Sequence, residues 1–171
     1  KSLVFCQSLS LNFNECFKLS DDSLKYLQES FSDLKALQNL TLCFPNCRKM
    51  SNQGLQYLSE CIKSLSQLHY LSLDFRNCSK FSDEGLGYLK DGIKEVKSLK
   101  HVDLDFSTQW NNPNESITDK GLIQLKEGIQ SVSSSIQRLS LNFTGCSNIS
   151  DVGVIKMKND LHNVLHLTIN K

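Results

Sequence analysis

The stretch LSLDFRNCSKFSDEGL at residues 71–86 contains the pattern that decides the fold. It opens with alternating apolar and polar residues, as in a half-buried strand, so Leu71, Leu73 and Phe75 are expected to face a core. From Leu86 onward, apolar residues recur at steps of three and four, which is the spacing of one face of an amphipathic helix. The stretch therefore predicts a strand, a turn and a helix, in that order.

Near-copies of this stretch occur along the whole chain of 171 residues. The first four begin 31 residues apart, and the fifth follows after 37 residues. The strand copies begin near residues 9, 40, 71, 102, 139 and 165. Such self-similarity is typical of solenoids, in which each unit packs on its neighbours. We therefore expect a single curved α/β solenoid over residues 1–171, with a parallel sheet on its concave face and helices on its convex face.

Both ends of the chain lack an obvious cap. The opening KSLVFCQSLSLNF aligns without gaps with KSLSQLHYLSLDF at 63–75, so the chain begins inside a repeat, and it stops just after the last strand copy. Solenoids need terminal units that cover their open ends. We therefore expect the chain to be a fragment of a longer protein.

The repeated pattern LxxLxLxFxxCxxISDxGLxxL resembles the leucine-rich repeats of the ribonuclease-inhibitor-like and cysteine-containing type, such as those of substrate-adaptor F-box proteins. The long repeats are also similar to those of leucine-rich-repeat proteins from ciliated protozoa. The resemblance extends over essentially the whole chain and implies a leucine-rich-repeat solenoid that serves as a binding scaffold. It also implies a slot, five residues after the second strand leucine, in which Cys or Asn packs inside the turn.

Four of the seven cysteines occupy this slot: Cys16, Cys47, Cys78 and Cys146. The fourth repeat is expected to lose the slot, because a longer loop replaces it. Zinc binding is the alternative, but the chain has neither a C-x₂-C pair nor an accompanying histidine pair. The odd number of regularly placed thiols favours packing in a reducing compartment, and hence an intracellular, cytoplasmic protein. Cys43, on the open side of the sheet, is the one candidate for a reactive thiol.

Five N-x-S/T motifs conflict with an intracellular location, because they would suit a secreted protein. They begin at Asn39, Asn77, Asn114, Asn142 and Asn148. Asn77 and Asn148 flank the cysteine turns, and Asn142 belongs to a predicted strand. Chance and repetition therefore explain the motifs better than glycosylation does.

The start of each predicted helix carries a capping signal. Ser82 is the expected N-cap, with a hydroxyl that accepts a backbone N–H, and Asp83 complements the positive end of the helix. The same cap position holds Ser20, Ser51, Thr118 and Ser150. The third residue after the cap is always small, which predicts a close approach of the chain: Ser23, Gly54, Gly85, Gly121 and Gly153.

Outward-facing positions on the predicted sheet form a candidate binding surface. Three carboxylates are expected to converge on the third and fourth strands, because parallel strands lie about 4.8 Å apart. Like charges on neighbouring strands repel, so a cationic group of a partner would relieve them; an internal counter-charge from Arg76 is the alternative. The candidate residues on the sheet are Tyr70, Asp74, Arg76, His101, Asp103, Asp105 and Arg138.

The loop STQWNNPNES at 107–116 is longer than its counterparts and carries the only tryptophan, Trp110. Inserted loops on one face of a repeat array often belong to the binding face, and Trp is enriched in binding hot spots. We therefore expect Trp110 to contact a partner. The alternative is that its ring packs back onto the solenoid.

Three classes of function are compatible with such a chain. The first is a non-catalytic module that binds a protein with a basic patch, with substrate recognition in a ubiquitin-ligase adaptor as a variant. The second is a permanent structural subunit of a cytoskeletal or ciliary assembly. The third is an enzyme or a metal site built on Asp74, Asp103, Asp105, His101 and Tyr70.

Several of these possibilities are disfavoured by the sequence. An open sheet gives little shelter from water, and neither a nucleophile–base pair nor a phosphate-binding glycine loop is present, so we expect no enzyme, cofactor or metal. The net charge of +1 gives no argument for nucleic acid or an anionic membrane. No apolar run approaches the roughly 18 residues of a membrane span.

Overall fold

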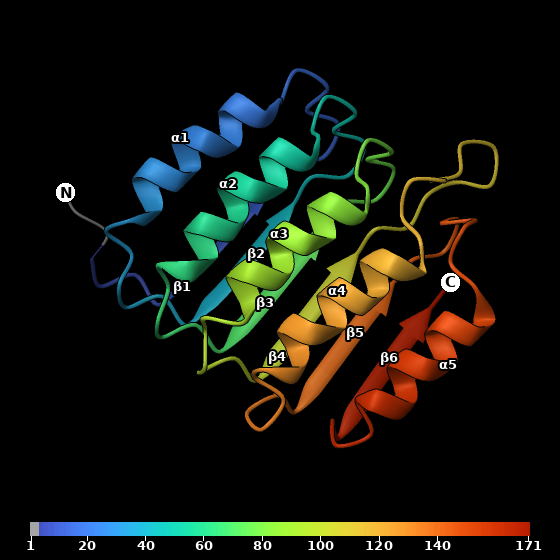
Figure 1. Cartoon of the computed structure of the whole chain (residues 1–171). Helices are drawn as coiled ribbons and strands as arrows, with labels where there is room; N and C mark the ends of the chain where they lie inside the picture. The colour runs from blue at the N-terminus through green and yellow to red at the C-terminus, as the bar shows by residue number, and fades with distance from the viewer. Residues whose placement is uncertain (1–3) are drawn as a thin grey trace.

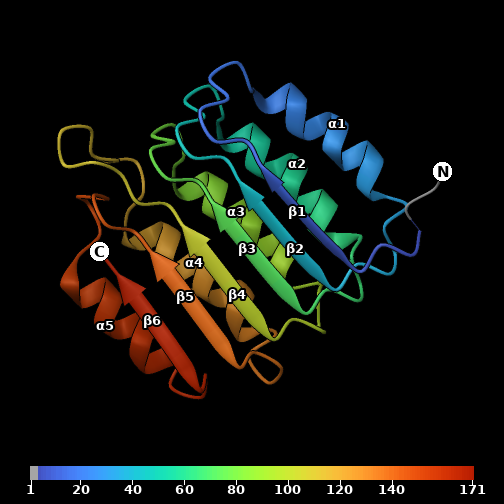
Figure 2. The ribbon, with the colours of Figure 1, turned by 180° about the vertical axis from the view of Figure 1, so that it is seen from behind.

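The computed structural model describes residues 4–171 and has six strands alternating with five helices in that range (Figure 1). The elements are β1 (Ser8–Asn12), α1 (Asp21–Phe31), β2 (Asn39–Cys43), α2 (Asn52–Lys63), β3 (Tyr70–Asp74), α3 (Asp83–Ile93), β4 (His101–Asp105), α4 (Asp119–Gln130), β5 (Arg138–Asn142), α5 (Asp151–Asp160) and β6 (His166–Asn170). All strands are parallel and pair in chain order. The helices cover one face of the sheet and leave the other open (Figure 2). The predicted α/β arrangement of repeated strand–helix units around a parallel sheet is present.

The last strand lies two residues later than its sequence copy suggested. Leu167, not Leu165, pairs with Leu139, and Leu165 is 77% exposed. The reason is that Val164 takes the buried position three residues before the strand leucine, which places Leu167 and Ile169 on the inward face. A shift by two residues keeps the same face inward. The error therefore changes the cross-strand neighbours but not the fold.

A stack of phenylalanine rings crosses the core from repeat to repeat. The stack consists of the residues that directly follow the first five strands: Phe13, Phe44, Phe75, Phe106 and Phe143. Neighbouring ring centroids are 5.1–5.7 Å apart, because the strand separation of about 4.8 Å brings equivalent rings into stacking contact. Phe81 meets Phe75 and Phe106 edge-on, with centroids at 5.1 and 5.8 Å.

The start of each helix from α2 to α5 is bound by the first residue of the preceding helix. The Asp83 carboxylate accepts the N–H and the hydroxyl of Thr118, both at 2.8 Å, and the Gly121 N–H at 2.9 Å. Equivalent hydrogen bonds join Asp21 to Ser51, Asn52 to Ser82, and Asp119 to Ser150. Asp83 lies in the first turn of its own helix, as expected, and its carboxylate also caps the next helix.

The expected serine and threonine caps are made in three of the five helices of residues 4–171. Ser51, Thr118 and Ser150 each accept a backbone N–H of their own helix. The other two cap residues, Ser20 and Ser82, make no such side-chain bond. The Ser82 hydroxyl accepts a hydrogen bond from the Asn52 amide at 2.7 Å, since an amide, unlike a carboxylate, supplies a donor.

The small third residue of each helix makes room for the side chain that arrives from the preceding repeat. A Cβ atom added to Gly85 would lie 2.7 Å from Asn52 Oδ1, and one added to Gly121 would lie 2.5 Å from Asp83 Oδ1. Both distances are too short for carbon and oxygen atoms that are not bonded. The predicted close approach is confirmed at these glycines, and its cause is the carboxylate or amide of the preceding repeat together with a leucine of that repeat, Leu55 or Leu86.

Three of the four slot cysteines are buried, as the packing interpretation predicted, and the fourth, Cys16, is partly buried. Cys47, Cys78 and Cys146 are each at most 4% exposed, and each thiol lies against a main-chain carbonyl of a preceding repeat. The shortest of these contacts joins Cys78 Sγ to the Phe44 carbonyl at 3.1 Å. All seven cysteines are free.

Asn114 fills the slot of the fourth repeat, which was wrongly expected to be lost. It lies four residues before the helix cap, as the slot cysteines do, and is 1% exposed. Its Nδ2 donates to the Phe81 carbonyl at 3.0 Å, and its Oδ1 accepts the Ile117 N–H at 3.0 Å. The slot is in register with the following helix, and the inserted residues precede it. Because the amide is enclosed, the folded chain leaves no room for a glycan at this motif.

The burial of the thiols predicts how many of them react. Burial raises the pKa of Cys47 to about 11 and the pKa values of Cys61, Cys78 and Cys146 to about 12, so these thiols stay protonated and enclosed near pH 8. With Ellman's reagent, no more than three of the seven thiols should react quickly in the folded protein, and all seven in denaturant. Rapid reaction of all seven without denaturant would contradict the packing of the slot.

Candidate functional site

The candidate residues on the open face form two groups at opposite ends of the strands, so they do not make one cluster. The first residues of β3, β4 and β5 form the N-terminal group: Tyr70, His101 and Arg138. The C-terminal group lies at or just beyond the ends of β3 and β4: Asp74, Arg76 and Asp105. Four strand steps separate the groups, about 13 Å at roughly 3.3 Å per residue. Asp103 lies between them, in the middle of β4.

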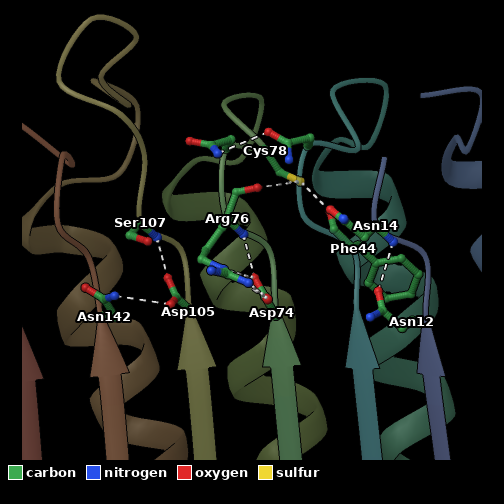
Figure 3. A network of polar contacts seen from close by, with 11 residues as sticks. Asn12, Asn14, Phe44, Asp74, Arg76, Cys78, Asp105, Ser107 and Asn142 are labelled. Atoms are coloured by element: carbon green, nitrogen blue, oxygen red, sulfur yellow. Dashed lines mark hydrogen bonds and ion pairs between the residues drawn. The ribbon is translucent and has the colours of Figure 1, made fainter. Parts of the chain in front are cut away.

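Asp74 and Asp105 form turns that end their strands (Figure 3). Asp74 Oδ1 accepts the Arg76 N–H at 3.0 Å, and Asp105 Oδ1 accepts the Ser107 N–H at 2.8 Å. These are Asx-turns, in which a side chain binds the backbone two residues further along the chain. Two of the three candidate carboxylates therefore have a structural role that the sequence analysis missed.

A sequence signal for these turns does exist. Asn12 and Asn142, at the ends of β1 and β5, also accept the N–H two residues on. β2 ends in Cys43 instead, and the residue two positions further is Pro45, which has no N–H to donate. Among these five strands, an Asx residue thus occurs where an N–H needs an acceptor. Comparing the last residue of each strand with the residue two positions later would have revealed the turn.

Internal partners already hold these two carboxylates. Arg76 Nη2 lies 2.7 Å from Asp74 Oδ2, and this hydrogen-bonded ion pair raises the pKa of Arg76. Asn142 Nδ2 donates to Asp105 Oδ2 at 3.1 Å. Asp103 is exposed, and within residues 4–171 no hydrogen bond or ion pair engages its carboxylate. Of the three carboxylates, Asp103 is the one whose charge is available to a partner.

The N-terminal group lines a shallow hollow of about 390 Å³ together with Asp103 and Ser140. The rings of Tyr70 and His101 meet edge to face, with centroids 6.2 Å apart. Arg138 follows on the next strand, directly beside His101. The hollow thus combines aromatic surface, one cation and one anion, which suits a polar side chain of a bound protein.

Cys43 lies in an environment that lowers the reactivity of its thiol. It borders a second hollow, of about 370 Å³, at the C-terminal ends of β1–β3. Burial and then the negative charge of Asp74 raise the pKa of the Cys43 thiol. A raised pKa reduces the thiolate fraction, and the thiolate is the reactive form. The geometry gives no support to a reactive thiol here.

The 107–116 loop projects from the C-terminal edge of the sheet (Figure 1) and is anchored on both sides. Thr108 is 7% exposed, and its N–H donates to the Thr144 carbonyl at 2.7 Å. The buried Asn114 anchors the other side of the loop. Trp110 lies between the two anchors and is 90% exposed. The alternative interpretation, in which the Trp110 ring packs back onto the repeats, is therefore wrong.

Comparison of the chain with models of known protein families gives no match, and comparison with curated protein sequences gives none either. Within residues 4–171, no helix combines the length and the apolarity needed to cross a membrane. The same residues contain no group of three or more His, Cys, Asp or Glu side chains placed to hold a metal ion.

Proposed function

We propose that the chain is a non-catalytic module that binds a partner protein through the open face of β3–β5 and the 107–116 loop. Trp110 is the observation that carries the proposal, because its ring is 90% exposed while the loop is anchored at Thr108 and Asn114. Trp is among the residues most enriched in binding hot spots. An anchored loop loses little freedom when a partner covers its tip, so binding through Trp110 would carry a small entropic penalty.

The chemistry of the partner follows from the residues that remain free. Asp103 offers one exposed carboxylate to a lysine or arginine, while Asp74 and Asp105 are engaged internally. The hollow beside Tyr70 and His101 offers an aromatic wall. A surface with one cation-binding position beside aromatic rings matches a partner strand or loop with a single central basic residue.

Affinity capture from the source cells tests this proposal. Trp110→Ala should reduce the captured partner at least tenfold, since truncating a hot-spot residue typically costs about 2 kcal/mol or more. Asp103→Ala should reduce it less, because an exposed ion pair contributes about 1 kcal/mol at most. Asp74 and Asp105 stay unaltered, since their loss would disturb the turns.

The matched control is Tyr26→Ala, which removes an exposed aromatic ring from α1 on the helical face. It should leave capture unchanged. If Trp110→Ala and Asp103→Ala retained every partner that the unaltered chain captures, the open face and the loop would not be the binding surface.

A further inference from the structure

A hollow of about 210 Å³ lies between α4 and α5, on the face opposite the open sheet (Figure 1). Where α4 packs on α3, Gly128 meets the neighbouring backbone so closely that a Cβ atom would lie 2.9 Å from the Lys90 carbonyl oxygen. The equivalent residue of α5 is Asp160, whose carboxylate binds Lys126 Nζ at 2.6 Å. This ion pair joins α4 and α5 at the position where α4 meets the backbone of α3 directly.

The groove is lined by two exposed apolar side chains, and one of them takes a helix position that is polar in the other four helices. Ile123 and Val152 line it and are 43% and 74% exposed. The second residue of the helix is Val152 in α5, whereas the other four helices have Asp22, Gln53, Glu84 and Lys120 there.

The exposure of Val152 is not a consequence of its place in the last helix. Its counterparts Gln53, Glu84 and Lys120 are also exposed, although α2, α3 and α4 each have a helix on both sides. A further repeat stacked on α5 would therefore leave Val152 in water. An apolar residue at such a position needs another explanation.

Of the charged side chains that line the groove, Lys156 is the one that no hydrogen bond or ion pair of residues 4–171 engages. Asp119 accepts the N–H and hydroxyl of Ser150, and Asp160 is paired with Lys126. Lys156 lines the groove and is exposed, and no carboxylate of residues 4–171 pairs with it. A segment that lies in the groove would meet an unpaired cation beside an apolar wall.

We propose that this groove binds an amphipathic helix of a partner protein, with acidic residues bordering its apolar face. Its apolar side chains would pack on Ile123 and Val152, and a carboxylate would pair with Lys156. The hollow is smaller than the roughly 300–1,000 Å³ of small-molecule sites, but it fits the anchoring side chains of a helix laid in a groove. The site lies opposite the open sheet, so the chain would hold two partners at once.

A designed peptide tests the proposal directly. The probe is a fluorescent synthetic helix with leucines at i, i+3, i+4 and i+7 and glutamates beside them, and its counterpart has lysines in place of the glutamates. In anisotropy titrations the acidic helix should bind more tightly than the basic one. Val152→Glu and Lys156→Glu should each weaken it about tenfold, and Lys156→Glu should improve binding of the basic helix.

The controls separate this site from the open face. Leu165→Glu introduces the same charge at an exposed apolar residue outside the groove and should leave the affinity unchanged, as should Trp110→Ala. Equal binding of both helices, or no effect of Val152→Glu in a variant with an unchanged circular dichroism spectrum, would overturn the proposal. Val152-dependent binding to phosphatidylserine vesicles without binding of the acidic helix would also overturn it, in favour of a membrane contact.

Discussion

Replacing Phe75 by alanine should lower the free energy of unfolding by about 3–5 kcal/mol. The Phe75 ring is fully buried and touches Phe44 and Phe106 in the stack and Phe81 at its edge. Its removal leaves a cavity that three repeats share, because the neighbouring rings are held by their own repeats and cannot close it. Urea denaturation followed by circular dichroism measures the loss.

Two further variants keep this prediction testable if the alanine variant does not fold. Phe17→Ala removes a ring that is 58% exposed and should change the stability by less than about 0.5 kcal/mol. Phe75→Leu retains most of the apolar volume and should give an intermediate loss. A loss below about 1 kcal/mol for Phe75→Ala would show that the stack contributes little.

Replacing Asp83 by alanine should destabilise the chain by about 2–3 kcal/mol, because three donors at the start of α4 lose their acceptor together. Those donors are the Thr118 N–H, the Thr118 hydroxyl and the Gly121 N–H. Asp22→Ala is the matched control. It removes an exposed aspartate from the first turn of α1 and should change the stability by less than about 0.5 kcal/mol.

A double-mutant cycle tests whether the carboxylate is what requires glycine at position 121. Gly121→Ala alone should cost about 1–3 kcal/mol, since its methyl group would overlap Asp83 Oδ1. In the Asp83→Ala background the same change should cost less, because the overlapping oxygen is gone and alanine favours a helix, while a contact of 2.9 Å with Leu86 Cδ1 remains. Simple addition of the two losses would show that the glycine serves another purpose.

The sequence predicted the repeats well because burial governs the residues that define them. Leu71, Leu73 and Phe75 recur as inward residues in copy after copy, and the open face has no comparable constraint. The one misplaced element, β6, is the copy in which Leu165 and Leu167 both fit the pattern. Only the packing of Val164 distinguishes the two registers.

The candidate site was harder to predict, because an aspartate at the end of a strand looks the same in the sequence in two different roles. Its carboxylate can accept a backbone N–H of its own chain, or it can face a partner. Asp74 and Asp105 were interpreted as facing a cationic group of a partner, with Arg76 as an internal alternative. The structure shows both accepting backbone N–H groups and pairs Asp74 with Arg76. The exposure of Trp110 depends on how Asn114 anchors the loop. The inserted residues concealed that Asn114 is equivalent to the slot cysteines. The groove beside Val152 depends on the spacing of two helices, which no single repeat encodes.

The hydrogen bonds between successive helix starts also bear on how such an array can grow. In every unit from α2 to α4, the first helix residue accepts a backbone N–H from the unit after it. The same unit has a cap residue that donates its N–H to the unit before it, and a glycine that makes room for that contact. Two consecutive units therefore fit together without any change that is specific to that pair. A gene duplication that copies one unit would deliver both halves of the contact at once, so arrays of different length could arise in single evolutionary steps.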